Sequence, residues 1–392
     1  MKIQLVSKTE CCGCGACANR CPGGCITMLP DTEGFLYPQI DPARCTECGL
    51  CEQACPVSHP VRGTAETPAA YGARAKDMDL RLKSSSGGVF SLLAERTLDR
   101  GGVVFGAALT PDCKAVRHIA VTERGRLAPL RGSKYLQSEI GDAFRQVLGH
   151  LEEGREVLFT GTPCQIDGLK RFLGRDRQGL LCMEVICHGV PSPALWERYI
   201  AYMGERSGAP IQKADFRHKK LSWTIFGARL ENSKRRVLYS TLHKDPYLQM
   251  FLKNICLRPS CYQCPSKGLD RRADLTVGDF WGIENVAPEL DDDKGTSLVL
   301  IHTEEGARAF SDISADLDMR RVDCMAALAG NICMLESVAR PAGRERFFED
   351  LGRMPFCELQ RKYVPVTRKE RAKIFLQERG LWTAVQSLRG KR

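Results

Sequence analysis

The sequence predicts a protein of mixed α+β and α/β class: a small cysteine-rich N-terminal domain, then a larger domain with a mixed sheet and a helical C-terminal region. Three observations lead to this prediction. Half of the 20 cysteines fall within residues 1–58. From residue 71 onward, short apolar runs alternate with amphipathic segments, as in a sheet covered by helices. Beyond about Arg320 the chain is polar with a helical pattern.

We therefore expect four segments along the chain. Residues 1–58 form the N-terminal domain, residues 71–175 and 176–350 form the two parts of the larger domain, and residues 351–392 form a basic helical tail. The run His59–Ala70 contains two prolines and a glycine among mostly polar or small residues, which is typical of a linker.

The composition indicates a folded protein of a reducing compartment. A hydrophobic content of 43% over 392 residues suits two or three domains. Residues 1–10 lack the apolar core of a secretory signal, and no apolar run is long enough to cross a membrane, so we expect no membrane span and a cytoplasmic location. Cysteines at metal-ligand spacing then indicate metal binding, not disulfides. The net charge of +10 comes without a nucleic-acid-binding motif, so we expect no nucleic-acid partner.

A four-cysteine pattern that occurs twice defines the N-terminal domain. It reads Cys-x-x-Cys-x-x-Cys-x-x-x-Cys-Pro, from Cys11 to Pro22 and from Cys45 to Pro56. This spacing is typical of two-cluster ferredoxins, in which three close cysteines hold one [4Fe–4S] cluster and the fourth reaches the other. We assign one cluster to Cys11, Cys14, Cys17 and Cys55. We assign the other to Cys45, Cys48, Cys51 and Cys21. A zinc module is the alternative, but zinc sites usually stop at two Cys-x-x-Cys pairs.

Two glycine-containing turns of the larger domain are candidates for binding phosphate. Ser84-Ser85-Ser86-Gly87-Gly88 opens an amphipathic helix that stops at Gly101, and the free amides of a helix start attract phosphate. A plain helix cap is the simpler interpretation of this turn taken alone. Gly132-Ser133-Lys134-Tyr135 precedes another helix and offers a cation beside an aromatic ring, although the same residues suit a surface turn.

Four cysteines of the larger domain are expected to meet. The strand predicted over 156–160 leads to Cys164, and the strand predicted over 180–186 ends at Cys187, so both would lie at one edge of an α/β sheet. The downstream pair Cys261-x-x-Cys264 brings the number of thiols to four, enough for a third [4Fe–4S] cluster. Zinc in the same cage is the alternative, and Cys256 could replace one of the four ligands.

The other features of the larger domain are structural in our interpretation. Residues 214–242 alternate apolar and polar side chains and predict an antiparallel addition, and strands are expected within 273–282 and 297–302. His188 is interpreted as a structural histidine that satisfies its own hydrogen bonds; the alternative is a histidine that donates a proton at this sheet edge. The remaining cysteines lack ligand spacing and are interpreted as packing residues: Cys12, Cys25, Cys113, Cys182, Cys324, Cys333 and Cys357.

Five motifs in order resemble the coenzyme F420 hydrogenase/dehydrogenase beta subunit family, in its form with an N-terminal two-cluster ferredoxin domain. They are Ser85–Phe90, Gly132–Tyr135, Gly161–Gln165, Ile186–Gly189, and the Cys261–Cys264 pair with Gly278–Gly282. The resemblance extends from Cys11 to about Phe348.

This resemblance implies an iron–sulfur flavoprotein whose larger domain holds FAD and a further [4Fe–4S] cluster. It implies that the third cluster is held by Cys164, Cys187, Cys261 and Cys264. It implies contacts to FAD from the two glycine turns and the strand end, at Ser86, Gly87, Gly88, Lys134, Tyr135 and Thr162. The implied activity is oxidoreductase: electrons pass between the clusters and coenzyme F420, or a similar hydride carrier, through FAD. The implied partner is a redox protein, such as a ferredoxin or a hydrogenase or dehydrogenase subunit. No catalytic residue is predicted.

Three other functions remain open at this stage. A flavin-dependent reductase of an organic substrate, such as a surface-polysaccharide precursor, would contain flavin but would not react with a deazaflavin. A non-catalytic electron-relay subunit would contain clusters but no flavin. A zinc-binding structural protein would be colourless.

Overall fold

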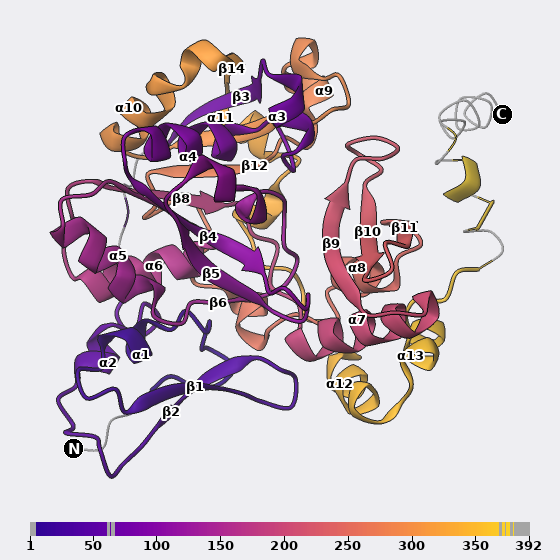
Figure 1. Cartoon of the computed structure of the whole chain (residues 1–392), viewed down its shortest axis with the longest axis horizontal. Helices are drawn as coiled ribbons and strands as arrows, with labels where there is room; N and C mark the ends of the chain where they lie inside the picture. Colours follow the sequence, from indigo (N-terminus) through magenta and orange to yellow (C-terminus); the bar gives the residue numbers. More distant parts are fainter. Residues whose placement is uncertain are drawn as a thin grey trace.

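The computed structural model describes residues 5–60, 63, 67–367, 371–372, 374–376 and 379 of the chain (Figure 1). Most of the predicted basic tail beyond residue 367, and part of the predicted linker between residues 60 and 67, lie outside the described residues. Among the described residues, no helix combines the length and the apolar character needed to cross a bilayer.

The N-terminal module is a pair of short helices beside a two-stranded sheet. Strands β1 (Ile26–Pro30) and β2 (Leu36–Ile40) pair antiparallel, and helices α1 (Ala16–Arg20) and α2 (Leu50–Gln53) each begin within a cysteine repeat. A glycine in the left-handed conformation precedes each helix, with φ of 71° at Gly15 and 73° at Gly49. Glycine adopts this conformation without steric strain, so each cysteine loop can turn sharply into its helix.

The larger domain is organised around a nine-stranded mixed sheet in the order β14-β3-β13-β12-β8-β7-β4-β5-β6. The four central strands β4, β7, β8 and β12 are parallel, whereas β13, β3 and β14 pair antiparallel with their neighbours. Strand β5 is antiparallel to β4 and parallel to β6. The strands are β3 (Ala69–Ala75), β4 (Val103–Leu109), β5 (Val116–Val121), β6 (Ser138–Glu139), β7 (Val157–Gly161), β8 (Leu180–Val185), β12 (Leu275–Asp279), β13 (Ser297–Ile301) and β14 (Leu317–Val322).

Helices cover both faces of this sheet because alternate residues of the central strands point to opposite sides. On one face, Val104 of β4 packs in a cluster with Val89 and Leu93 of α4 (Val89–Asp99). On the other face, Phe105 packs in a cluster with residues of α5 (Ala143–Glu152) and α6 (Pro163–Leu173). Shorter helices close the edges: α3 (Met78–Leu82), α9 (Ile283–Val286), α10 (Glu304–Asp312) and α11 (Cys324–Leu328).

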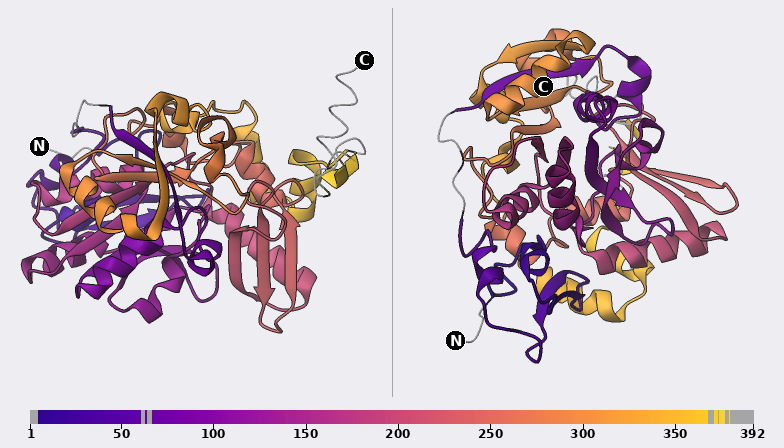
Figure 2. Two further views of the ribbon diagram at one scale, coloured as in Figure 1. Left: turned by 90° about the horizontal axis from the view of Figure 1, so that it is seen from above. Right: turned by 60° about the vertical axis from the view of Figure 1, so that its left-hand side comes forward.

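A three-stranded antiparallel sheet, in the order β11-β10-β9, projects to one side of the main sheet (Figure 2). Its strands are β9 (Ile211–His218), β10 (Gly227–Asn232) and β11 (Val237–Thr241). Residues of this sheet share a hydrophobic core with four helices. They are α7 (Pro193–Ser207), α8 (Pro246–Leu252), α12 (Arg344–Arg353) and α13 (Phe356–Tyr363).

The predicted fold class is confirmed, with one local difference. The helices and strands predicted between residues 84 and 186 are present, and the addition predicted over 214–242 is the three-stranded sheet. The helical pattern expected from Arg320 is wrong for its first residues, because β14 continues to Val322 and pairs with β3. Tertiary pairing outweighs local propensity at such an edge strand.

The N-terminal module is bonded firmly to the larger domain. Arg344 of α12 is almost fully buried and forms a two-pronged ion pair with Glu33, with Nη1 donating to Oε1 over 2.9 Å. Ser192 Oγ donates to the carbonyl of the same Glu33 over 2.6 Å, and Asn19 Nδ2 donates to the Gly141 carbonyl over 2.8 Å. An ion pair and several hydrogen bonds thus hold the N-terminal module against the larger domain.

Candidate functional site

Two small cavities in the N-terminal module are each lined by four of the predicted ligands. The first is lined by Cys11, Cys14, Cys17 and Cys55. The second is lined by Cys21, Cys45, Cys48 and Cys51, with Cys25 beside them. In each cavity one cysteine comes from the other repeat, which is the crossed arrangement expected from the sequence.

The surroundings of these thiols suit a bound cation. Burial, with smaller contributions from the neighbouring thiols of Cys11 and Cys55, raises the pKa of Cys17 to about 12. Ligation requires the thiolate form, so positive metal charge has to offset the burial. Among the described residues, no three His, Cys, Asp or Glu side chains are placed to hold a single metal ion. In a cubane cluster, by contrast, each thiolate binds a different iron.

A third group of cysteines forms where β7 and β8 end. Cys164 lies in the first turn of α6, Cys187 follows β8 by two residues, and Cys261 and Cys264 lie in and after a short 3-10 helix, Pro259–Gln263. The charges of these four side chains act on one another. Burial raises the pKa of Cys261 to about 12 and that of Cys264 to about 11.

Cys256 is separated from this group. Its side chain is fully buried in the hydrophobic core around α7 and α8. The groups that act on its pKa, beyond burial itself, are backbone amides and Arg344, and none is one of the four cysteines. The structure thus brings together the four cysteines named from the sequence and leaves the spare cysteine elsewhere.

Cys12 connects the first and third groups. Its thiol is within hydrogen-bonding reach of Cys14 on one side and Cys164 on the other. The backbone of Gly168 on α6 also lies against the first group, since a Cβ there would be 3.0 Å from Cys14 Sγ. Sequence reasoning interpreted Cys12 as a packing residue only; its position beside two cysteine groups depends on how the module docks.

A cavity of about 550 Å³ opens over the carboxyl ends of the central strands. Ligands of open α/β sheets bind at this edge, and the volume is ordinary for a cofactor site. The lining includes seven residues named from the sequence: Ser86, Gly88, Lys134, Tyr135, Thr162, Cys164 and Cys187. Gly87 is not part of the lining. It is a close-packing position instead, because a Cβ there would be 2.2 Å from the Ala73 carbonyl oxygen.

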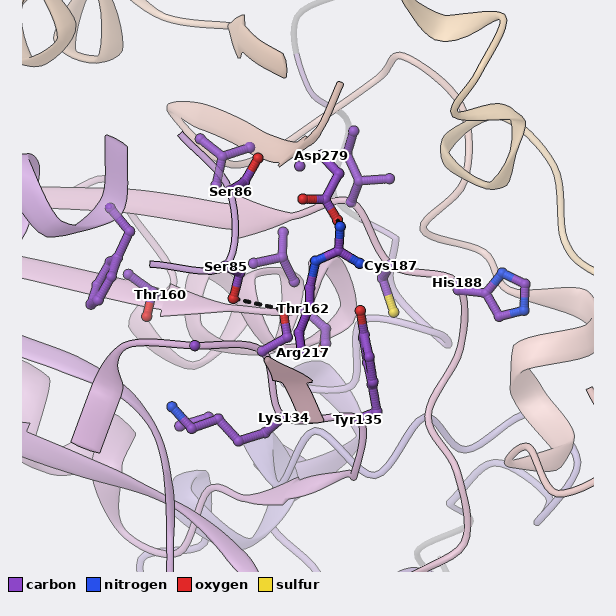
Figure 3. A pocket seen from close by; sticks show the side chains of 18 of the residues that line it. Ser85, Ser86, Lys134, Tyr135, Thr160, Thr162, Cys187, His188, Arg217 and Asp279 are labelled. Atoms are coloured by element: carbon purple, nitrogen blue, oxygen red, sulfur yellow. Dashed lines mark hydrogen bonds and ion pairs between the residues drawn. The ribbon is translucent and has the colours of Figure 1, made fainter. Parts of the chain in front are cut away.

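The serine-rich end of the cavity is suited to an anion. Gly88, with φ of 92°, starts α4 so that the helix N-terminus lies against the cavity. Ser133 Oγ donates to Ser85 Oγ over 2.9 Å, which joins the two glycine turns (Figure 3). Helix N-termini and hydroxyl donors together form a common phosphate-binding arrangement.

Lys134 lines this end but is engaged with its own turn. Its Nζ donates to the carbonyls of Pro129 and Arg131 over 2.7 and 2.8 Å. Burial lowers the pKa of Lys134 to about 7, and the nearby carboxylate of Asp215 acts in the opposite direction. The pKa of His118 is lowered to about 4, mainly by burial and to a smaller extent by the nearby positive charge of Lys134.

Sequence reasoning missed Arg217 in the lining of the cavity. Arg217 of β9 is buried, and its Nη2 lies 3.1 Å from Asp279 at the end of β12 (Figure 3). The stacked indoles of Trp223 and Trp281, 5.1 Å apart, lie beside this guanidinium. The Nε of Arg217 is buried and has no hydrogen-bond partner among the described residues. Only the Asp279 turn could have been found, since it belongs to a quoted motif.

His188 and Cys333 also line the cavity. His188 Nε2 lies 2.6 Å from Asn254 Oδ1, in agreement with a structural role. Cys333 lies beside Lys267, whose Nζ donates to the carbonyls of both Cys187 and Cys333. Cys333 is therefore a cavity residue near the third group, not simply a packing residue of the core.

Three family models match the chain in series. Residues 10–59 match the 4Fe-4S dicluster domain. Residues 70–145 match the N-terminal part, and residues 154–323 the C-terminal part, of the coenzyme F420 hydrogenase/dehydrogenase beta subunit. The last two matches together cover more than half of the chain.

Individual relatives match shorter stretches. An NADH-quinone oxidoreductase subunit I from Pelobacter propionicus is 35% identical over 69 residues, which are 16% of this chain and 37% of that protein. A second NADH-quinone oxidoreductase subunit I, from Geobacter metallireducens, is 43% identical over 56 residues, 13% of this chain and 43% of that protein. The chain spans less than half the length of these curated relatives.

A solved structure is also similar over part of the chain. It is a chain of the F420-reducing [NiFe] hydrogenase complex from Methanosarcina barkeri, at 18% identity and a TM-score of 0.46. The match covers 65% of this chain and 82% of that one.

Proposed function

Because this chain belongs to the coenzyme F420 hydrogenase/dehydrogenase beta subunit family and carries a 4Fe-4S dicluster domain, we propose that it moves electrons between [4Fe–4S] clusters and coenzyme F420, or a similar hydride carrier, through bound FAD. Family membership makes it an iron–sulfur oxidoreductase subunit for electron transfer. The third cluster, the flavin and the deazaflavin are the proposed parts.

The arrangement of three cysteine groups and one cavity carries this proposal. Cys12 lies between the first group, at Cys14, and the third group, at Cys164. Cys164 and Cys187 of the third group also line the large cavity. A cluster at the third group would thus adjoin the N-terminal module on one side and a cofactor pocket on the other.

Features of the cavity support binding of a dinucleotide with a flavin ring. The start of α4 and the hydroxyls of Ser85 and Ser133 suit the pyrophosphate. Tyr135 stacks on Phe251, with centroids 5.1 Å apart, and gives the cavity an aromatic wall. A bound flavin exchanges single electrons with clusters and a hydride with an organic carrier, which joins the two kinds of transfer.

The chain's own residues orient the ligands and exclude water. Lys134 is the candidate countercharge for phosphate, since an anion would compete for its ammonium with the two backbone carbonyls. Arg217, which lines the cavity, is the candidate for positioning the second substrate. Asp279 keeps this guanidinium in place from the end of β12.

The test is an anaerobic one. The protein is purified, reconstituted with iron, sulfide and FAD, and mixed with reduced coenzyme F420 while the flavin absorbance is followed. Bleaching of the flavin, followed by reduction of the clusters, is the expected result. A protein that binds FAD and accepts electrons from dithionite, but not from reduced F420, would exclude the deazaflavin and leave an organic substrate for the same pocket. A protein that binds clusters but no FAD would be an electron-relay subunit.

A further inference from the structure

We propose that Arg258 sets the reduction potential of the inner N-terminal cluster, held by Cys11, Cys14, Cys17 and Cys55, above that of the outer one, held by Cys21, Cys45, Cys48 and Cys51. Arg258 belongs to the larger domain, between β11 and β12, yet its side chain ends inside the N-terminal module. The inference rests on the proposed location of these two clusters and concerns how electrons are distributed between them.

The contacts of Arg258 are directed at the first cysteine group. Its Nη2 lies 3.7 Å from Cys11 Sγ and donates to it, and its Nε donates to the Cys11 carbonyl over 2.7 Å. Nη1 and Nη2 also donate to Gln137 Oε1 and to the Leu36 carbonyl. The guanidinium is therefore fixed in both position and orientation against one sulfur.

The backbone of the cysteine loop leaves room for this side chain. A Cβ on Gly13, where φ is +69°, would lie 2.7 Å from Arg258 Nη1. The ring of Tyr37 lies 4.3 Å from the guanidinium carbon and that of Phe35 lies 5.4 Å from it. Glycine at this position of the Cys-x-x-Cys loop thus permits the close approach.

Arg258 is fully buried, and among the described residues no carboxylate forms an ion pair with it. A guanidinium stays protonated in proteins, and a buried charge is costly unless an opposite charge is close. A cluster with four thiolate ligands is an anion, and its sulfur at Cys11 lies where Arg258 donates. The anionic cluster is therefore the counter-ion that this buried cation lacks.

The effect on the potential follows from charge. Reduction adds one electron to a cluster and makes it more negative, so a fixed cation stabilises the reduced form more than the oxidised form. Among the described residues that line the outer cavity, the one cation is Arg44, which is exposed and donates to the Gly23 carbonyl, so the outer group has no buried cation of this kind there. With both clusters bound, Arg258 would favour transfer of one electron from the outer cluster, which would be oxidised, to the inner cluster, which would be reduced, with no change of bonds or protons.

The experiment is a redox titration of the reconstituted full-length protein, followed by electron paramagnetic resonance. Variants Cys11→Ser and Cys45→Ser identify the inner and outer signals. In Arg258→Gln, we expect the inner cluster to favour its oxidised form by about tenfold more than in the parent, a shift of about 59 mV to lower potential for one electron. The outer signal should not move.

Matched variants keep the test decisive. Arg258→Lys retains the charge but loses the forked geometry, so its shift should be smaller than that of Arg258→Gln. Arg44→Gln is the control at the outer group and should leave the inner potential unchanged. An inner potential unchanged in Arg258→Gln, with the iron content intact, would overturn the proposal. If Arg258→Gln fails to retain the inner cluster, the uncharged variant Arg258→Met is titrated instead, and an inner potential equal to that of the parent overturns the proposal.

These measurements separate the inference from the proposed function. The titration uses dithionite and mediators, and requires neither FAD nor coenzyme F420. A shift at the inner cluster in a protein that does not react with F420 would reject the deazaflavin and retain the role of Arg258.

Discussion

The two cysteine groups of the N-terminal module share one sequence pattern but have different surroundings. The inner group is contacted by Arg258 and by the backbone of Gly168, and lies beside the third group. At the outer group Cys48 is exposed, and among the described residues none from the larger domain hydrogen-bonds to its cysteines. A sequence repeat therefore predicts the same ligands twice but not the same role. Under the proposed function, the outer group would exchange electrons with a partner protein, and the inner group would pass them inward.

The largest effect on the comparison between the inner and outer groups is expected from removing a ligand of the third cysteine group. If the inner group passes electrons inward, Cys164→Ser should remove about four of roughly twelve irons and stop electron flow from the N-terminal clusters to flavin. Iron analysis and the rate of flavin reduction measure both effects. Cys256→Ser is the matched control and should keep all the iron, because Cys256 is buried away from the group. Loss of four irons in the control instead would reject the ligand assignment.

The second prediction weakens the contact between the N-terminal module and the larger domain, which is the contact that makes the inner group different from the outer one. Arg344→Met leaves Glu33 as a largely buried carboxylate without its partner, so the free energy of unfolding should fall by about 3–5 kcal/mol. Chelator should then remove iron from the inner group faster than in the parent, while the outer group changes little. Urea unfolding and timed chelation are the measurements. Arg145→Met, which removes an exposed contact to the Ala18 carbonyl, should change stability by less than about 1 kcal/mol.

FAD binding at the proposed flavin site serves as a control, because neither N-terminal cysteine group should affect it. Lys134→Ala should weaken FAD binding by about tenfold, as expected for loss of a hydrogen bond to a charged group. Burial holds the pKa of Lys134 at about 7, below its usual value, so the free protein loses this positive charge as the pH rises through 7. FAD affinity should therefore fall between pH 6 and pH 8.5 in the parent and stay nearly flat in the variant.

Fluorescence titration measures this affinity. His118 and Asp215 are the ionisable groups that interact with the lysine; His118, with a pKa of about 4, stays neutral across the range. An affinity that is unchanged in Lys134→Ala would remove the lysine from the FAD site.

The smallest expected effect is on the rate of electron transfer from a partner protein, and it tests whether the partner docks at the outer group. Arg44 is exposed beside it, so Arg44→Glu should slow electron transfer from an acidic redox partner by roughly two- to threefold at low salt and little at high salt. Arg308→Glu, on α10 at the far side of the main sheet, serves as the control for net charge (Figure 1). Equal effects of both variants would mean that partners do not dock at the outer group.

Local spacing and strand order made much of this site predictable. The eight N-terminal cysteines follow one short pattern, and Cys164 and Cys187 were expected together because parallel strands end at one edge. Arg258 could not be predicted in the same way, since it lies 247 positions from Cys11 and has no spacing rule. The edge strand β14 and its neighbour β3 were missed because their pairing, not their composition, makes them strands.

The position of β3 has a consequence for how the chain is made. Both neighbours of β3 come from much later in the sequence, and pairing with β13 joins Ala73 to Ser297. The cysteine repeats, by contrast, are complete at Pro56. A ribosome adding 5–20 residues per second needs roughly ten to forty seconds to travel between these strands. During that interval all the cysteine ligands of the N-terminal module have been synthesised, whereas the two strands that pair with β3 have not. Iron–sulfur clusters can therefore be inserted into the module before the nine-stranded sheet is complete.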